Sequence, residues 1–298
     1  MNAHAAFLDV PVPTRGTALP LGGHSGAQVV LCAADDGAFV RKTAASPAAN
    51  LRLRQQALKQ RLLAAQGFAF PVVRRGGLDP SRCAYFEMDY IPARTLGEVV
   101  LGAVPVDRGA IVAAVATLLR AFAALDGGAI DPARFEDKIG AIAAQADQRP
   151  PLRPHAGAIA TLGTALLARD WTGIPHTPDH GDLTLENILL SPEKGLVFID
   201  CDVAWVSSWW LDLAKLFQDF EGHWCLRGQV RPSVDALERL RLFALDFRAL
   251  AREMDPRLPP RLAQFAALHL FRVLPYAQST QSVGFACAAA ARLLDDAP

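Results

Sequence analysis

The sequence predicts an α+β fold in which a small β-rich lobe precedes a larger, mostly helical lobe. Up to about Pro92, short runs of strand-forming residues alternate with turn residues, whereas from Thr95 onward the apolar residues mostly recur at helical spacing. Of the 298 residues, 51% are hydrophobic, so the chain can bury a substantial core. We therefore expect an amino-terminal lobe over residues 1–91 and a carboxyl-terminal lobe over residues 92–298.

The β-rich lobe begins with a predicted hairpin. Residues 27–33 and 38–43 are rich in strand formers, and the intervening residues contain an Asp-Gly pair, which is typical of a tight turn. A helix is predicted over residues 50–66, which contain no Gly or Pro, with Asn50 as its N-cap. The apolar residues that fall near one face of this helix are Leu51, Leu58, Leu62 and Ala65.

Two further strands complete the predicted β-rich lobe, at residues 71–74 and 83–90. The residues between them include Gly76–Pro80, a strong turn signal. Later in the chain, helical spacing of apolar residues predicts helices over residues 108–125, 159–168, 207–220, 235–253, 260–274 and 282–294.

Polar residues gather at the ends of a second predicted hairpin. The string HGDLTLEN (residues 180–187) precedes an apolar run, a turn, and a second apolar run that ends at Asp200. Because neighbouring antiparallel strands bring their opposite ends together, Asn187 and Asp200 are expected side by side. Carboxylate and amide oxygens are hard ligands, which suit Mg²⁺ together with phosphate oxygens.

This segment resembles the catalytic and metal loops of the protein-kinase-like superfamily, in its aminoglycoside phosphotransferase and choline kinase branch. The resemblance implies a bilobal protein-kinase-like fold. It implies that Asp182 is the catalytic base that accepts or orients the proton of the acceptor hydroxyl. Asn187 and Asp200 would ligate Mg²⁺ bridging the ATP phosphates, and His180 would brace the loop.

The same resemblance makes residues 1–91 the nucleotide-binding lobe and residues 92–298 the catalytic and substrate-binding lobe. A glycine-rich loop before the first strand would let backbone N–H groups approach phosphates, although an ordinary turn explains these glycines equally well. Lys42 matches the strand lysine that pairs with the α- and β-phosphates, and the residues after the strand at 83–90 resemble the hinge that reads adenine. The residues assigned to the nucleotide are Gly22, Gly23, Ser25, Gly26, Lys42, Met88, Asp89, Tyr90 and Ile91.

The sequence departs from the family pattern in the helix at residues 50–66. This helix should carry an acidic partner for Lys42 but contains no Asp or Glu, so Gln56 or Gln60 is expected to take that place as a weaker, neutral acceptor. Two interpretations of Asp202 stay open, a second metal contact or a solvated turn carboxylate. In the helix at 207–220, Asp212 begins a D-x-A motif and is interpreted as an architectural brace for the catalytic loop.

These features predict an ATP- and Mg²⁺-dependent phosphotransferase that moves the γ-phosphate of ATP to a hydroxyl of a small molecule. The acceptor would be an aminoglycoside, a choline-like alcohol or a sugar. One alternative is a pseudokinase-type nucleotide-binding or interaction module with little turnover, which the missing helix acid supports. Another is transfer of a different group, such as an adenylyl group. Candidate acceptor-site residues are Glu221, His223, Trp224, Arg227, Arg272 and Tyr276.

Composition and charge indicate which classes of partner and which cellular location to expect. Lys and Arg together number 30, as do Asp and Glu, and without a basic excess nucleic-acid binding is not expected. The five cysteines are scattered, and the amino terminus lacks the pattern of a signal peptide, so a cytoplasmic protein is predicted. The most apolar stretch, near residues 110–125, is interrupted by Arg120, so no membrane span is expected. The oligomeric state stays open.

Overall fold

The computed structural model describes residues 18–21, 26–34, 37–102, 105–125, 127–229 and 231–296. The chain divides into two compact units. The first consists of Met1–Leu96 and Asn187–Val203, and the second of Gly97–Glu186 and Ala204–Pro298. The string HGDLTLEN is therefore divided between them after Glu186.

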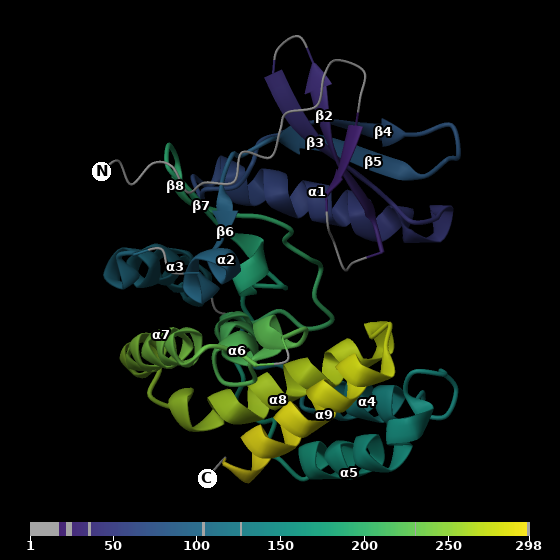
Figure 1. Cartoon of the computed structure of the whole chain (residues 1–298), viewed down its shortest axis with the longest axis vertical. Helices are drawn as coiled ribbons and strands as arrows, with labels where there is room; N and C mark the ends of the chain where they lie inside the picture. Colours follow the sequence, from purple (N-terminus) through teal and green to yellow (C-terminus); the bar gives the residue numbers. More distant parts are fainter. Residues whose placement is uncertain are drawn as a thin grey trace. The chain divides into compact units, whose positions relative to one another are not determined.

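The first unit contains a five-stranded antiparallel sheet, counted over the described residues, in the order β1-β2-β3-β5-β4 (Figure 1). The predicted strands are present, and β1 is an addition too short to predict. β4 includes Gly76 and Gly77, so the turn after it is displaced to Asp79–Arg82, where Arg82 takes a left-handed φ of 63°. The strands are β1 (Ala18–Leu21), β2 (Gln28–Ala34), β3 (Gly37–Thr43), β4 (Val73–Leu78) and β5 (Ala84–Asp89).

Helix α1 (Asn50–Ala65) packs on this sheet, but not through the predicted apolar face (Figure 1). Its buried residues are Leu53, Gln56, Gln60 and Leu63. The leucines expected to face the core, Leu51, Leu58 and Leu62, are 68%, 57% and 56% exposed. The buried face carries two glutamines because their amides find specific hydrogen-bond partners, which compensates for their removal from water.

The start of α1 also differs from the prediction. Asn50 is the first residue of the helix and not its N-cap, a position held by Ala49. The Asn50 side chain instead accepts a hydrogen bond from Ala84 N at 2.6 Å and donates one to Arg82 O at 2.9 Å. These bonds fasten the beginning of α1 to the beginning of β5.

The predicted hairpin after the catalytic string is present as β7 (Ile188–Ser191) and β8 (Gly195–Phe198). With β6 (Arg94–Thr95) they form a three-stranded antiparallel sheet within the described residues. Phe198 N donates to Ala69 O at 2.8 Å, and the rings of Phe70 and Phe198 lie 5.8 Å apart between centroids. These contacts join the hairpin to the residues that follow α1.

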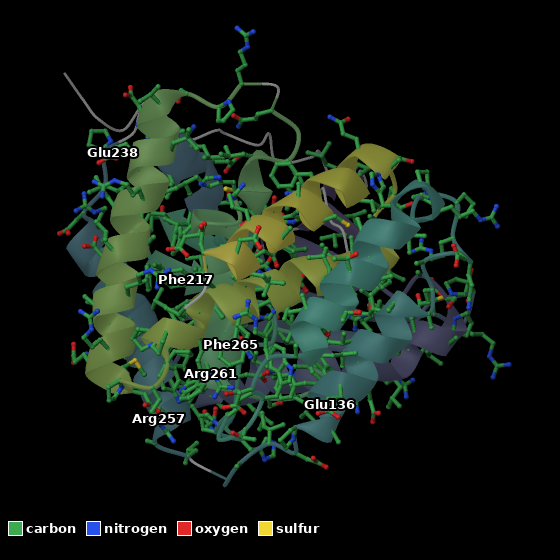
Figure 2. The ribbon with its side chains drawn as sticks, turned by 90° about the horizontal axis from the view of Figure 1, so that it is seen from below. Glu136, Phe217, Glu238, Arg257, Arg261 and Phe265 are labelled. Carbon is green, nitrogen blue, oxygen red and sulfur yellow. The ribbon has the colours of Figure 1, made fainter. Side chains whose placement is uncertain are left out.

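The second unit is helical, which confirms the predicted α+β fold class. Helix α6 is buried along its whole length and packs against α7 and α8, while α8 also packs against α9. Figure 2 labels Phe217 of α6 and Phe265 of α8 among the side chains of this unit. No helix among the described residues is both long and apolar enough to span a bilayer. The helices from Leu96 onward are α2 (Leu96–Leu101), α3 (Arg108–Ala123), α4 (Ala133–Ala143), α5 (Ala156–Leu167), α6 (Trp209–Phe220), α7 (Val234–Met254), α8 (Leu262–Val273) and α9 (Thr280–Asp295).

Two of these helices were not predicted from the sequence. Helix α2 is too short for its periodicity to stand out. Helix α4 mixes charged residues with a glycine, yet its apolar residues Phe135, Ile139 and Ile142 share one buried face. That i, i+4, i+7 spacing is the signal that would have identified it.

Candidate active site

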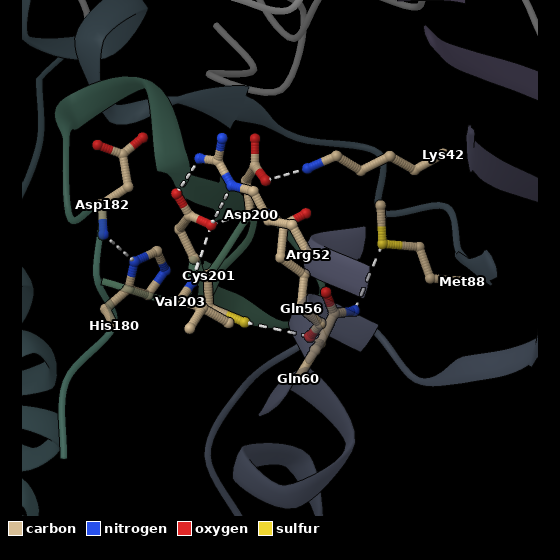
Figure 3. Close-up of polar contacts among 11 residues, drawn as sticks. Lys42, Arg52, Gln56, Gln60, Met88, His180, Asp182, Asp200, Cys201 and Val203 are labelled. Atoms are coloured by element: carbon tan, nitrogen blue, oxygen red, sulfur yellow. Dashed lines mark hydrogen bonds and ion pairs between the residues drawn. The ribbon is translucent and has the colours of Figure 1, made fainter. Parts of the chain in front are cut away.

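Lys42 is a buried cation in β3 whose side chain meets a carboxylate. The residue is 3% exposed, and its Nζ forms an ion pair with Asp200 Oδ1 (Figure 3). The Asp200 side chain itself is 33% exposed. A buried ammonium needs an opposite charge to offset its desolvation, and here that charge comes from the residue two positions after β8.

The opposite face of β3 carries a second ion-pair cluster. Because strand side chains alternate, Arg41 points away from Lys42, and it pairs with Glu87 of β5. Glu87 is 2% exposed and also pairs with Arg75. Burial alone would raise the pKa of Glu87, but hydrogen bonds from Arg75 and Arg41 hold it below its ordinary value. This cluster holds β3, β4 and β5 together and leaves Lys42 to the other face.

Asp200 has an unusual backbone conformation. Its φ of 55° lies in the left-handed region, which Asp tolerates better than most residues but which still carries strain. Just before it, Ile199 N donates to Asn187 O at 3.0 Å, so Asn187 lies next to the end of β8, as the hairpin predicted. The oxygens of Asn187 and Asp200 are of the kind that Mg²⁺ prefers. Among the residues that the structure describes, no cluster of three or more His, Cys, Asp or Glu side chains could hold a metal ion by itself. Magnesium would thus also need oxygens from nucleotide or water.

Asp202 is not the solvated turn carboxylate of one of the two interpretations left open by the sequence, and the other, a second metal contact, stays a prediction. Its side chain is only 19% exposed and accepts hydrogen bonds from Arg52 and from Gln56 of α1 (Figure 3). Burial would raise the pKa of Asp202, but these two donors hold it below its ordinary value. The glutamines that were expected to hold Lys42 are engaged elsewhere: Gln60 donates to Pro71 O at 2.7 Å.

In the second unit, α6 fixes the backbone of the predicted catalytic loop at residues 180–187. Asp212, in the first turn of α6, accepts hydrogen bonds from His180 N and, at 2.8 Å, from Gly181 N. His180 is fully buried, and its Nδ1 accepts from Asp182 N at 3.3 Å. The predicted bracing role of Asp212 is confirmed by these bonds.

The charged partner of Asp182 was missed from the sequence. Lys215, one turn after Asp212 on α6, places its Nζ 3.2 Å from Asp182 Oδ1. The Lys215 side chain is 11% exposed, whereas that of Asp182 is 39% exposed and open to solvent. Asp182 is thus held from one side by a largely buried cation.

A third ionisable residue of α6, Asp219, also contacts the segment that contains Asp182. Asp219 accepts a hydrogen bond from Leu185 N at 3.0 Å, and complete burial raises its pKa to about 7. Asp212, Lys215 and Asp219 follow i, i+3, i+7 spacing, so they lie on one face of the helix. Charged residues at helical spacing in an otherwise apolar helix are the sequence signal that would have revealed this face.

A comparison with known protein families shows the family of this chain. The model of the phosphotransferase enzyme family matches residues 17–251. The chain belongs to this phosphotransferase family. No curated protein matches this phosphotransferase.

Solved structures with the same fold include several kinases of small molecules. A thermostable mutant of aminoglycoside phosphotransferase APH(4)-Ia, in its apo form, aligns with a TM-score of 0.60 and 15% identity over 94% of each chain. The choline kinase LicA from Streptococcus pneumoniae aligns with a TM-score of 0.58 and 16% identity over 94% of each chain. A glucosamine kinase aligns with a TM-score of 0.54 and 16% identity over 94% of this chain and 77% of its own. The predicted protein-kinase-like fold is therefore confirmed for this phosphotransferase.

Of the other residues that the sequence assigned to the nucleotide, those that the structure describes lie just before β2 and at or beyond the end of β5. Gly22, Gly23 and Ser25 lie outside the described residues; Gly26 has a φ of 74°. The others are arranged along β5 and just beyond it. Met88 Sδ lies 3.4 Å from Gln60 Nε2, Asp89 pairs with Arg74 at 2.8 Å, and Tyr90 and the buried Ile91 follow the strand. Their role in nucleotide binding stays a prediction.

Three of the candidate acceptor residues of this phosphotransferase, Glu221, Trp224 and Arg227, have side-chain partners within the second unit. Arg248 donates to both carboxylate oxygens of Glu221, so the negative charge of Glu221 is already paired with a guanidinium. The Arg227 guanidinium lies 4.7 Å from the centroid of the Trp224 ring. Arg227 Nη1 also lies 3.3 Å from Glu186, the residue before Asn187. Of the candidates, Arg227 has the most direct connection to the catalytic loop.

Proposed function

We propose that this phosphotransferase uses ATP and Mg²⁺ to phosphorylate a hydroxyl group of a small molecule. The family match supports phosphoryl transfer in general. A related structure of the same fold is described as a ternary complex with ADP and hygromycin B, which supports a nucleotide and a small-molecule acceptor here as well.

The pairing of Lys42 with Asp200 carries this proposal. These residues lie 158 positions apart, and the family resemblance assigns one to the ATP phosphates and the other to Mg²⁺. Their ion pair within one unit supports a site where a cation for the phosphates and a carboxylate for the metal lie together. When Mg²⁺-ATP binds, Lys42 would turn from Asp200 to the phosphates, and Asn187 and Asp200 would hold the ion, which neutralises charge on the phosphate oxygens.

Asp182 would act on the acceptor. Its carboxylate, held by Lys215, would accept a hydrogen bond from the acceptor hydroxyl and take its proton as the oxygen–phosphorus bond forms. The bond between the γ-phosphorus and the bridging oxygen would break, releasing ADP. The protein's contribution would be mainly orientation and electrostatic stabilisation, as is usual in phosphoryl transfer.

The test is acceptor-dependent release of ADP from ATP with a panel of aminoglycosides, choline, ethanolamine, amino sugars and nucleosides. We expect at least one acceptor to stimulate ADP release in the presence of Mg²⁺. Asp182→Asn should abolish this stimulation while ATP still binds, and Asp137→Asn, at an exposed position on α4, should leave it unchanged. Release of pyrophosphate in place of ADP would indicate adenylyl transfer. Absence of both turnover and Mg²⁺-ATP binding would contradict the proposal and favour an interaction module.

A further inference from the structure

Helix α1 contacts the segment around Asp200 through a cluster whose charges are opposite to those expected from the family. The family pattern calls for an acid on this helix, and α1 has none. It instead presents Arg52 and Lys59, and the acid, Asp202, is on the loop after β8. We infer that Arg52, Gln56 and Lys59 form a clamp on Asp202 that positions Asp200, and we call these four residues the Asp202 clamp.

The contacts of the Asp202 clamp come from one face of α1. Arg52, Gln56 and Lys59 follow i, i+4, i+7 spacing. Arg52 Nε donates to Asp202 Oδ1 at 3.0 Å, and its Nη2 pairs with Oδ2, so the guanidinium engages both carboxylate oxygens. Gln56 Nε2 donates to Oδ1 at 2.7 Å, and Lys59 Nζ donates to the backbone carbonyl of Asp202 at 2.6 Å. Side chain and backbone of Asp202 are both held.

The clamp lies at the end of the segment 200–202, in which each residue has a contact that restrains it. Asp200 pairs with Lys42 of β3, and the buried Cys201 places its Sγ 3.8 Å from Gln56 O, a weak contact with the same helix. Because Asp200 has a left-handed backbone conformation, its neighbours must hold it there. Asp202, two residues further, provides the attachment to α1.

We assign the Asp202 clamp a positioning role for the metal ligand Asp200, which rests on the function proposed above. In that function Asp200 holds Mg²⁺. Residues that orient a metal ligand without touching the metal commonly change metal affinity about 10–100-fold when they are replaced. Arg52 and Gln56 would thus act through Asp202 on Asp200 and replace the acid–lysine pair between α1 and β3.

Charge exchange in the full-length protein tests the clamp. The variants are Arg52→Glu, Asp202→Arg and the two combined, with Arg54→Glu, an exposed position on the same helix, as the matched control. The readout is the Mg²⁺ concentration that gives half-maximal binding of a fluorescent ATP analogue. Each single exchange should raise this concentration about tenfold, and the combined variant should recover most of the loss because the ion pair is restored in reverse. Arg54→Glu should leave it unchanged.

Urea unfolding of the same variants distinguishes the clamp from a purely structural contact. A non-additive change in the free energy of unfolding for the combined variant would confirm that residues 52 and 202 interact. If they interact but the Mg²⁺ midpoint does not move in either single variant, the positioning role is wrong. If the unfolding energies are additive, the clamp itself is wrong. If the native protein binds no Mg²⁺-nucleotide, the proposed function fails and the positioning role fails with it, while the unfolding cycle still reports on the ion pair.

Discussion

Lys215 is the residue of α6 that lies against the Asp182 carboxylate, and its replacement should affect turnover more than nucleotide binding. Lys215→Met removes the ion pair with Asp182, for which we take the roughly 1.5–3 kcal/mol typical of hydrogen bonds to charged groups as the expected magnitude. If that energy is fully used in the transition state, kcat should fall roughly tenfold to a hundredfold, with KM for ATP nearly unchanged. Steady-state kinetics would measure both, with Lys194→Met in an exposed turn as the control. If Lys215→Arg recovers part of kcat, the result supports this role. If Lys194→Met loses as much kcat as Lys215→Met, the result contradicts it.

Asp219 should make the stability of the protein depend on pH. Its pKa is raised to about 7 by burial and by the charge of Glu186, against the opposing effects of the Leu185 N–H bond, Lys215 and Arg227. In the unfolded chain an Asp titrates near 4, so between about pH 4 and 7 the folded state binds the extra proton. This contribution to stability is complete below about pH 4 and is lost as the pH rises through 7, at a slope of at most about 1.4 kcal/mol per pH unit.

The Asp219→Asn variant separates this contribution from those of other groups. It should weaken the pH dependence of the free energy of unfolding between pH 4 and 7, as measured by urea denaturation at several pH values. An unchanged slope would mean that Asp219 is ionised across this range.

At the scale of the helix, α6 supports the catalytic loop through backbone hydrogen bonds. Asp212→Ala would leave the N–H groups of His180 and Gly181 without their acceptor in a buried region. Each unsatisfied buried donor costs about 1–3 kcal/mol, so the free energy of unfolding should fall by about 2–6 kcal/mol. Asp137→Ala, at an exposed site, should change it by less than about 0.5 kcal/mol. A loss no larger than that of the control would show that water replaces the carboxylate.

Helix α6 is also held by aromatic packing against α7. The Phe220 ring stacks on Phe243 and Phe247 of α7, at centroid distances of 5.9 and 5.4 Å. Phe220→Ala should therefore cost about 3–5 kcal/mol of unfolding free energy. Leu245→Ala, whose side chain on α7 is 50% exposed, is the matched control and should cost far less. Equal losses in the two variants would contradict this account of the core.

For the whole molecule, ligand binding should be visible as a change in stability. A ligand that binds only the folded state at 100 times its Kd adds about 2.7 kcal/mol to the free energy of unfolding. Mg²⁺-ATP should therefore raise the Tm, and EDTA should remove most of the increase because Asn187 and Asp200 would then lack their ion. Thermal unfolding with ATP alone, with Mg²⁺ alone and with both would measure this. An increase of the same size without Mg²⁺ would indicate that the nucleotide does not use the metal.

The parts of the molecule that were predicted correctly are those that depend on short stretches of sequence. The hairpin of β7 and β8 follows from two apolar runs around a turn, and its geometry alone brings Asn187 beside Ile199. The brace from Asp212 was inferred from a local motif of the family. The apolar stripe of α1 misled the prediction because hydrophobicity did not decide which face was buried: Gln56 and Gln60 lie inside since their amides have partners there.

Local pattern was thus sufficient for the α+β class, for most helices and strands, and for the string that carries the candidate chemistry, because these depend on neighbours a few residues apart. Which charged side chains form ion pairs, in contrast, was decided only by the tertiary structure. Lys42 meets Asp200 across 158 residues and Arg52 meets Asp202 across 150, and no spacing rule connects residues at such separations. Each buried charge requires an opposite partner to offset its desolvation, and the fold determines which partner is near enough to serve.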